Sequence, residues 1–268
     1  MIPIKDNIPT DRFPFVTVAL IVVNVIVYLL SIRHGGSLIS GPATDEVIRY
    51  GAIPRALTHP GVHCAEVAVQ AAAGTAQPAL ICNTRALAAA GIPAQNTLPT
   101  WTTVLSSMFV HGSILHLAGN MLFLWIFGNN VEDSMGPVRF LAFYLLGGAA
   151  ALALQAAVDP SSTAPTVGAS GAIAAVLGGY ILLYPRARVL TLVFIILFFT
   201  VIELPAIVML GIWFVQQAVF GAADLTNPTG GGGGVAYFAH VGGFAFGLLA
   251  IHALATRRKQ IPPRLPVY

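Results

Sequence analysis

The sequence predicts an all-α polytopic membrane protein with six spanning helices in one domain, residues 1–268. Of its 268 residues, 56% are hydrophobic and 9% are charged, and the mean hydropathy is +0.81. A soluble domain carries about 25% charged residues, so this composition is typical of a chain that crosses a bilayer several times. Six apolar stretches are long enough to span a bilayer. They are residues 13–32, 112–131, 139–158, 169–185, 204–221 and 236–255.

Basic residues at the ends of these stretches predict their orientation. Six spans place the following residues on one face: Lys5, Arg12, Arg139, Arg186, Arg188, Arg257, Arg258 and Lys259. The short segments 159–168 and 222–235 contain no Lys or Arg, so the positive-inside rule makes both termini cytoplasmic. The formal charge of +3 follows this topology rather than a stripe suited to nucleic acid, and no nucleic-acid partner is expected.

The first stretch, 13–32, reads as a membrane span rather than a signal peptide, because no small-residue cleavage site follows it. The long loop 33–111 between the first two spans is then external. It contains both cysteines of the chain, Cys64 and Cys82. A hairpin tied by a disulfide and a disordered insert with two unpaired thiols are both compatible with this segment.

The second stretch begins with "HGSILHLAGN". His116 and Asn120 are four residues apart and share a helix face, while His111 lies nearer the membrane surface. Polar side chains in a span are costly, so they serve either function or hydrogen bonds between helices. Glu132 and Asp133 at the inner end are expected to be structural, with Arg139 as a possible partner.

The fourth stretch begins with "GASG" around Ser170, flanked by Gly168 and Gly171. A serine here is often only a helix cap. The small residues that follow, Ala174 among them, would let another helix approach closely.

Two segments around the fifth stretch lack a clear span pattern. Residues 189–202 are apolar and precede Pro205, and we expect a short interfacial segment there. Residues 222–235 include five consecutive glycines, which predict a mobile external loop.

The sixth stretch contains "AHVGGFAFG". His240 precedes Gly243 and Gly247, a pair of small residues that allows tight packing on one face. Packing or proton relay is the alternative use of a lone histidine in a membrane.

Taken jointly, these polar residues suit amide hydrolysis. Ser170 can act as a nucleophile with His240 as its base, and His116 with Asn120 can donate to an oxyanion. If the second, fourth and sixth spans open to the same face, these residues lie at a similar depth. A metal site is not expected, because the histidines lack the i, i+4 pair of a zinc helix and no HExxH occurs.

The three motifs, in this order on these spans, resemble the signatures of the rhomboid intramembrane serine proteases. The resemblance implies a six-helix rhomboid-like bundle and a Ser170–His240 dyad that needs no cofactor. It also implies an oxyanion hole and supporting positions. The oxyanion hole would comprise Asn120, His116 and the Ser170 backbone N–H, with Gly168 contributing backbone to the site. His111 would lie in a water-access region, and residues 204–235 would form a gate and cap. Gly243 and Gly247 would bring the sixth span against the fourth.

Two positions depart from the family's pattern. Trp101 is not followed by Arg, and Ala174 stands one turn after Ser170, where many members have a tyrosine that stacks on the catalytic histidine. The residue that would hold His240 is therefore left open.

The resemblance implies an endopeptidase that cleaves transmembrane segments of membrane proteins near the external face, with those substrates and lipid as its partners. The expected location is a prokaryotic plasma membrane. A proteolytically inactive, client-binding rhomboid-like protein and a histidine-lined transporter are the alternatives.

Overall fold

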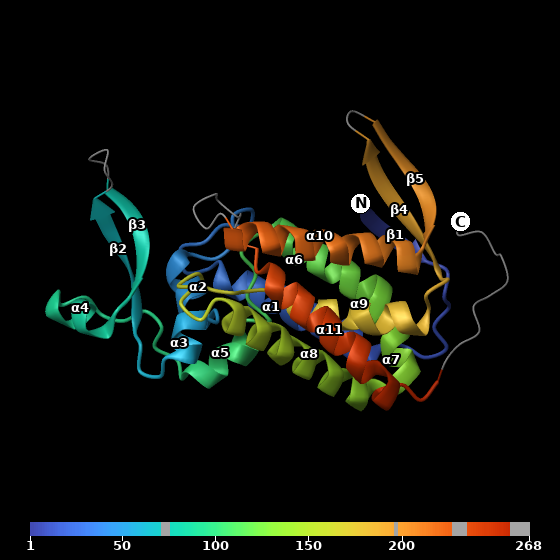
Figure 1. Ribbon diagram of the computed structural model, residues 1–268, viewed down its shortest axis with the longest axis horizontal. Helices are drawn as coiled ribbons and strands as arrows, with labels where there is room; N and C mark the ends of the chain where they lie inside the picture. The colour runs from blue at the N-terminus through green and yellow to red at the C-terminus, as the bar shows by residue number, and fades with distance from the viewer. Residues whose placement is uncertain (71–75, 196–197, 227–234, 258–268) are drawn as a thin grey trace.

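The computed structural model describes residues 1–70, 76–195, 198–226 and 235–257. A bundle of helices carries a small β-sheet at each end (Figure 1). The N-terminus and the last turn of the final helix lie at one end, here called the terminal end. Residues 35–70 and 76–111 lie at the other, here called the disulfide end (Figure 1).

The bundle helices fall on the six apolar stretches that the sequence predicts. They are α1 (Phe15–Ser31), α6 (Ile114–Phe123) continued by the π-helical turn η1 (Leu124–Gly128) and α7 (Asn129–Met135), α8 (Pro137–Val158), α9 (Ser170–Leu183), α10 (Ala206–Thr226) and α11 (Tyr237–Leu254). Within the described ranges, four helices are long and apolar enough to cross a membrane: Ile114–Met135, Pro137–Val158, Ala206–Leu225 and Tyr237–Leu254. The helices α1 and α9 are shorter apolar helices.

Glu132 holds the first turn of α1 against α7. Its buried carboxylate accepts hydrogen bonds from the backbone N–H of Val16 (3.0 Å) and of Thr17 (2.8 Å), and from the Thr17 hydroxyl (2.8 Å). The first N–H groups of a helix have no acceptor within the helix and carry the positive end of its dipole, so a carboxylate is stabilised there. The partner of Glu132 is therefore α1, where the sequence suggested Arg139.

The helices α9 and α11 touch through their backbones. A Cβ atom built on Gly243 would lie 2.0 Å from the carbonyl oxygen of Gly171, and one on Gly247 would lie 2.0 Å from that of Ala175. A glycine is required at both positions, because any Cβ would force the two helices apart. The small-residue motif of the sixth stretch thus brings α11 directly onto α9, as the sequence predicts.

Gly243→Ala is expected to lower the free energy of unfolding by about 1–3 kcal/mol, the usual cost of overpacking. It should also lower any activity that needs α9 and α11 in register. Unfolding in mixed detergent micelles measures the first effect. Gly211→Ala is the matched control, since a Cβ on Gly211 in α10 meets no atom within 4 Å. Equal stability of the two variants would contradict the tight contact.

A three-stranded antiparallel sheet at the terminal end departs from the all-α prediction. It contains β1 (Ile2–Asp6), β4 (Arg188–Ile195) and β5 (Phe198–Pro205), in the order β1-β4-β5. The residues that were expected to form an interfacial segment, 189–202, are rich in β-branched and aromatic side chains, which favour strands. An ion pair between Arg188 and Glu203 (2.8 Å) joins β4 and β5 near the bundle.

Asp6, at the end of β1, is buried against the bundle. Its carboxylate accepts hydrogen bonds from the hydroxyl of Tyr180 in α9 and from Asn130 Nδ2 (2.8 Å) in α7. Burial raises the pKa of Asp6 to about 6, and these hydrogen bonds offset only part of that effect. The folded state therefore binds the Asp6 proton more tightly than the unfolded state does. The stabilising effect of this tighter binding is complete below about pH 4 and is lost as the pH rises through about 6.

Asp6→Asn should remove this pH dependence. Its amide oxygen can still accept both hydrogen bonds without a buried charge. At pH 8 the variant is expected to exceed the wild type in unfolding free energy by about 3 kcal/mol, from about 1.4 kcal/mol per pKa unit. At pH 4 the difference should vanish. Thermal unfolding in detergent at both pH values, with Asp224→Asn at an exposed site as control, measures it. A constant difference would contradict the assignment.

The described residues of the disulfide end form a folded subdomain of helices and a hairpin rather than a disordered insert. Its elements are α2 (Thr44–Tyr50), α3 (Pro54–Thr58), β2 (Cys64–Gln70), β3 (Ala76–Cys82), α4 (Thr84–Ala89) and α5 (Thr100–Ser106). Cys64 and Cys82 face each other across the β2–β3 hairpin and form a disulfide. Of the two readings that the sequence left open, the hairpin tied by a disulfide is the one observed.

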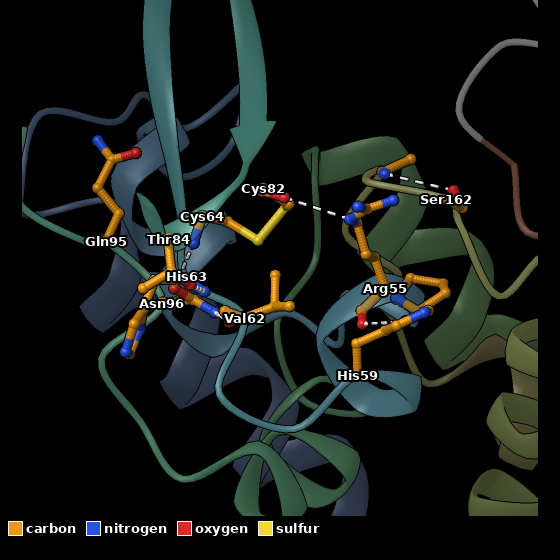
Figure 2. The surroundings of a disulfide bond; sticks show 12 residues. Arg55, His59, Val62, His63, Cys64, Cys82, Thr84, Gln95, Asn96 and Ser162 are labelled. Atoms are coloured by element: carbon orange, nitrogen blue, oxygen red, sulfur yellow. Dashed lines mark hydrogen bonds between the residues drawn. A yellow bond between two sulfur atoms is a disulfide. The ribbon is translucent and has the colours of Figure 1, made fainter. Parts of the chain in front are cut away.

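This subdomain is hydrogen-bonded to the loop that leads into α9. The Nε–H of Arg55 donates to the Cys82 carbonyl (3.2 Å), as Figure 2 shows, and the Arg55 backbone N–H donates to the Ser162 carbonyl (3.0 Å). Ala52 and Thr166 exchange two backbone hydrogen bonds of 3.0 and 2.8 Å. The entry to α9 is thereby supported from the disulfide end.

The glycine run of segment 222–235, residues 230–234, lies outside the described residues. The helix α10 continues to Thr226, past the end of the predicted span 204–221.

Candidate active site

Ser170 is the first residue of α9 and opens onto a cavity at the disulfide end of the bundle. The cap position is Ala169, and no side chain caps this helix, so the capping role that the sequence allowed for Ser170 is not observed. Gly168 turns the chain into the helix with φ +115°, a conformation that favours glycine, and its N–H donates to the Ser107 carbonyl (2.8 Å). The Ser170 hydroxyl is left free to meet a side chain from another helix.

That side chain is His240, on the first turns of α11. Its Nε2 lies 2.8 Å from the Oγ of Ser170, within hydrogen-bond distance. The backbone contact of Gly243 with Gly171, described above, sets this approach. Sequence analysis predicted the pair, and the fold brings the two residues together across 70 positions of the chain.

Two residues of α10 hold the imidazole of His240, and neither was predicted from the sequence. The Nδ1 of His240 lies 2.8 Å from Oε1 of Gln217, and the Trp213 ring lies 5.7 Å from the imidazole centroid to centroid. A polar Gln217 one turn after Trp213 in an apolar span was the available signal. An aromatic ring at Ala174 would not fit, because Ala174 is fully buried with its Cβ against Gly243.

His116 and Asn120 lie on one face of α6, as their spacing predicts. The Ser113 side chain caps this helix by accepting from the His116 N–H (3.1 Å). A Cβ on Gly168 would lie 2.7 Å from His116 Nε2 and 3.5 Å from Asn120 Nδ2, so both side chains reach the turn that precedes Ser170. Within the described part of the chain, the buried Nδ2 of Asn120 has no acceptor. A donor without an acceptor is available for an oxygen atom in the cavity.

His111 is fully buried, whereas the resemblance implied a position near water. Its Nε2 accepts the N–H of Ala169 (3.4 Å), its Nδ1 donates to the Phe109 carbonyl (3.3 Å), and its ring lies edge-on to His116 at 5.1 Å. Its contacts therefore brace the turn before Ser170.

Gly171 packs away from the cavity. A Cβ there would lie 2.6 Å from the Ala151 Cβ of α8, so this glycine admits a neighbouring helix behind Ser170.

The cavity has a volume of about 550 Å³ and lies among α6, α9, α10 and α11. Its walls are mostly apolar, and its polar residues include Ser170, His240, His116, Asn120, Ser113 and Thr166. A few convergent polar groups in an apolar pocket are typical of a ligand or substrate site. No cluster of three or more His, Cys, Asp or Glu side chains suited to a metal ion occurs in the described ranges.

Comparisons with known proteins find related sequences. A model of the Rhomboid domain family matches residues 98–257, more than half of the chain. Rhomboid protein 1, mitochondrial, of Saccharomyces cerevisiae is 30% identical over 153 residues, which cover 55% of this chain and 40% of that protein. RHOMBOID-like protein 12, mitochondrial, of Arabidopsis thaliana is 32% identical over 165 residues, covering 55% and 45%. Presenilin-associated rhomboid-like protein, mitochondrial, of Homo sapiens is 34% identical over 97 residues, covering 35% and 25%.

The matched region spans less than half the length of each of these relatives. All three are named as mitochondrial proteins, which contradicts the expected location in a prokaryotic plasma membrane. The charge pattern at the ends of the spans reports the direction of insertion and does not identify the membrane.

Proposed function

This chain belongs to the rhomboid family, and we propose that it is an intramembrane serine endopeptidase with Ser170 as nucleophile and His240 as base. The observation that carries this proposal is the 2.8 Å contact between Ser170 Oγ and His240 Nε2 in the cavity. A hydroxyl becomes a useful nucleophile only when an adjacent base takes its proton. Transport does not require a serine hydroxyl that is activated by a base, so it does not explain the contact between Ser170 and His240.

The proposed acylation step breaks a peptide bond of the substrate. Ser170 Oγ attacks the carbonyl carbon while its proton passes to His240 Nε2. The tetrahedral intermediate collapses as the carbon–nitrogen bond breaks, and His240 returns the proton to the departing amine. Water then attacks the carbonyl carbon of the acyl-enzyme while His240 Nε2 takes its proton. His240 returns this proton to Ser170 Oγ as the bond between the carbonyl carbon and Oγ breaks.

The negative oxygen of the tetrahedral intermediate requires donors. Asn120 Nδ2 is buried without an acceptor in the described structure. This observation supports the assignment of Asn120 as an oxyanion donor. The His116 ring beside it and the Ser170 backbone N–H, in the unpaired first turn of α9, complete the proposed oxyanion hole. Gly168 supports the same site because a side chain there would collide with His116.

We assign the whole chain to a single membrane domain with six spans, the shorter helices α1 and α9 included. At 1.5 Å per residue, the 14 residues of α9 measure about 21 Å, less than the hydrocarbon thickness of about 30 Å. This length supports a site sunk below the membrane face that carries residues 33–111. The proposed substrates are transmembrane segments, which must unwind locally to expose a carbonyl, so helix-destabilising residues should promote cleavage.

A fluorophosphonate, which reacts with activated serines, tests the proposal. The purified protein in detergent is expected to form one adduct, located on Ser170 by mass spectrometry, and to cleave a model transmembrane substrate. Unfolded protein is the control for unselective labelling. A folded protein that neither labels nor cleaves would favour the inactive, client-binding form of the fold or a transport role.

A further inference from the structure

Gln217 is a buried amide on an otherwise apolar helix. The residue is only 8% exposed, and its Oε1 lies 2.8 Å from Nδ1 of His240. Its neighbour Gln216 is exposed, about 100° further around α10. A buried amide is retained at low cost only where it is hydrogen-bonded, so the inward position of Gln217 calls for a partner that His240 supplies.

The helix α10 presents one face to α11 at this point. Trp213 lies one turn before Gln217 and adjoins the imidazole, and Phe214 stacks on Phe244 at 4.5 Å between centroids. Phe220 meets Tyr237 edge-on at 5.8 Å, one turn further along. These contacts hold the amide of Gln217 at a defined place beside the ring.

We propose that Gln217 is a positioning residue that selects the tautomer and orientation of His240 for attack by Ser170. This inference rests on the proposed function. A neutral imidazole carries a proton on one nitrogen only. With Oε1 of Gln217 as acceptor, the proton resides on Nδ1, and the lone pair of Nε2 faces the Ser170 hydroxyl. The amide oxygen, a negative dipole end, also stabilises the imidazolium that forms when Ser170 gives up its proton.

The site is then assembled from three helices: Ser170 on α9, His240 on α11 and Gln217 on α10. A displacement of α10 by about 1 Å would lengthen the hydrogen bond and release the ring, and misplacement of that size is costly in catalysis. The rate of cleavage would therefore depend on the packing of α10 against α11.

Gln217→Met tests the proposal, because methionine has a similar size and cannot accept the hydrogen bond well. We expect kcat to fall on the order of 10²-fold with KM nearly unchanged; the about 10⁴-fold loss for a carboxylate partner is an upper bound, since an amide carries no charge. The rate of fluorophosphonate labelling should fall by the same factor. Gln216→Met, on the exposed side of the same helix, is the matched control. Gln217→Glu keeps an acceptor and should restore kcat to within about tenfold of the wild type.

A second measurement does not depend on the folding of any variant. Nitrogen NMR of the histidine rings in the wild type should show neutral His240 as the Nδ1–H tautomer. An Nε2–H tautomer, or an unchanged kcat in folded Gln217→Met, would overturn the role of Gln217 while leaving the proposed function intact. A wild type that neither labels nor cleaves would instead reject the proposed function.

Discussion

Ser170→Ala is expected to lower kcat for cleavage of a transmembrane substrate by about 10⁶-fold, the loss seen when a serine protease loses its nucleophile. His240→Ala should lose a similar factor, because the hydroxyl then has no base within hydrogen-bond distance. The double variant should be no worse than either single one, since the two groups act as a unit. Initial rates on a model substrate, with fluorophosphonate labelling in parallel, measure all three.

Stability measurements accompany these rates. Ser170 is small and partly exposed to the cavity, so its alanine variant should unfold like the wild type. Additive losses in the double variant would mean that Ser170 and His240 act separately. Cleavage that persists in Ser170→Ala would reject the assignment of the nucleophile.

Asn120→Ala is expected to lower kcat by about 10²–10³-fold, as for removal of one oxyanion donor. The effect should fall on kcat rather than KM, because the oxygen gains its charge only in the transition state. The unpaired Nδ2 of Asn120 predicts little loss of stability on its removal, since no protein hydrogen bond to it is described. Steady-state kinetics together with thermal unfolding separate the two effects.

Asn83→Ala serves as the matched control for this substitution. Asn83 caps α4 at the disulfide end by accepting the Ala86 N–H (3.1 Å), and it does not line the cavity. Its loss should cost about 1 kcal/mol of stability and leave kcat unchanged. If Asn120→Ala behaved in the same way, Asn120 would be a structural residue only.

Much of the bundle could be predicted from local patterns. Each apolar stretch of spanning length contains a helix, because a chain in lipid must satisfy its backbone groups internally. The i, i+4 spacing of His116 and Asn120 placed them on one face for the same geometric reason. The glycines at 243 and 247 predicted a close helix contact, and a Cβ atom built on either would lie 2.0 Å from a backbone carbonyl oxygen of α9.

The strands at the terminal end were not predicted from the sequence. Segment 189–202 is apolar without helical or alternating polarity, and the sheet depends on pairing between β4 and β1, about 185 residues apart in the chain. The buried acid Asp6 has the same origin, since its partners Asn130 and Tyr180 come from two other elements. Contacts between segments so far apart in the chain cannot be predicted from a short window of sequence.

By itself, the sequence determined the membrane character of this chain, its helical stretches and the motifs around Ser170, His240, His116 and Asn120, because apolar length and helical spacing are local properties. Tertiary structure alone decided that Gln217 and Trp213 would hold His240, that Cys64 would pair with Cys82, and that Glu132 would hold α1 rather than meet Arg139. Each of these contacts joins segments distant in the chain, and a hydrogen bond or disulfide forms only where folding brings both partners within a few ångströms.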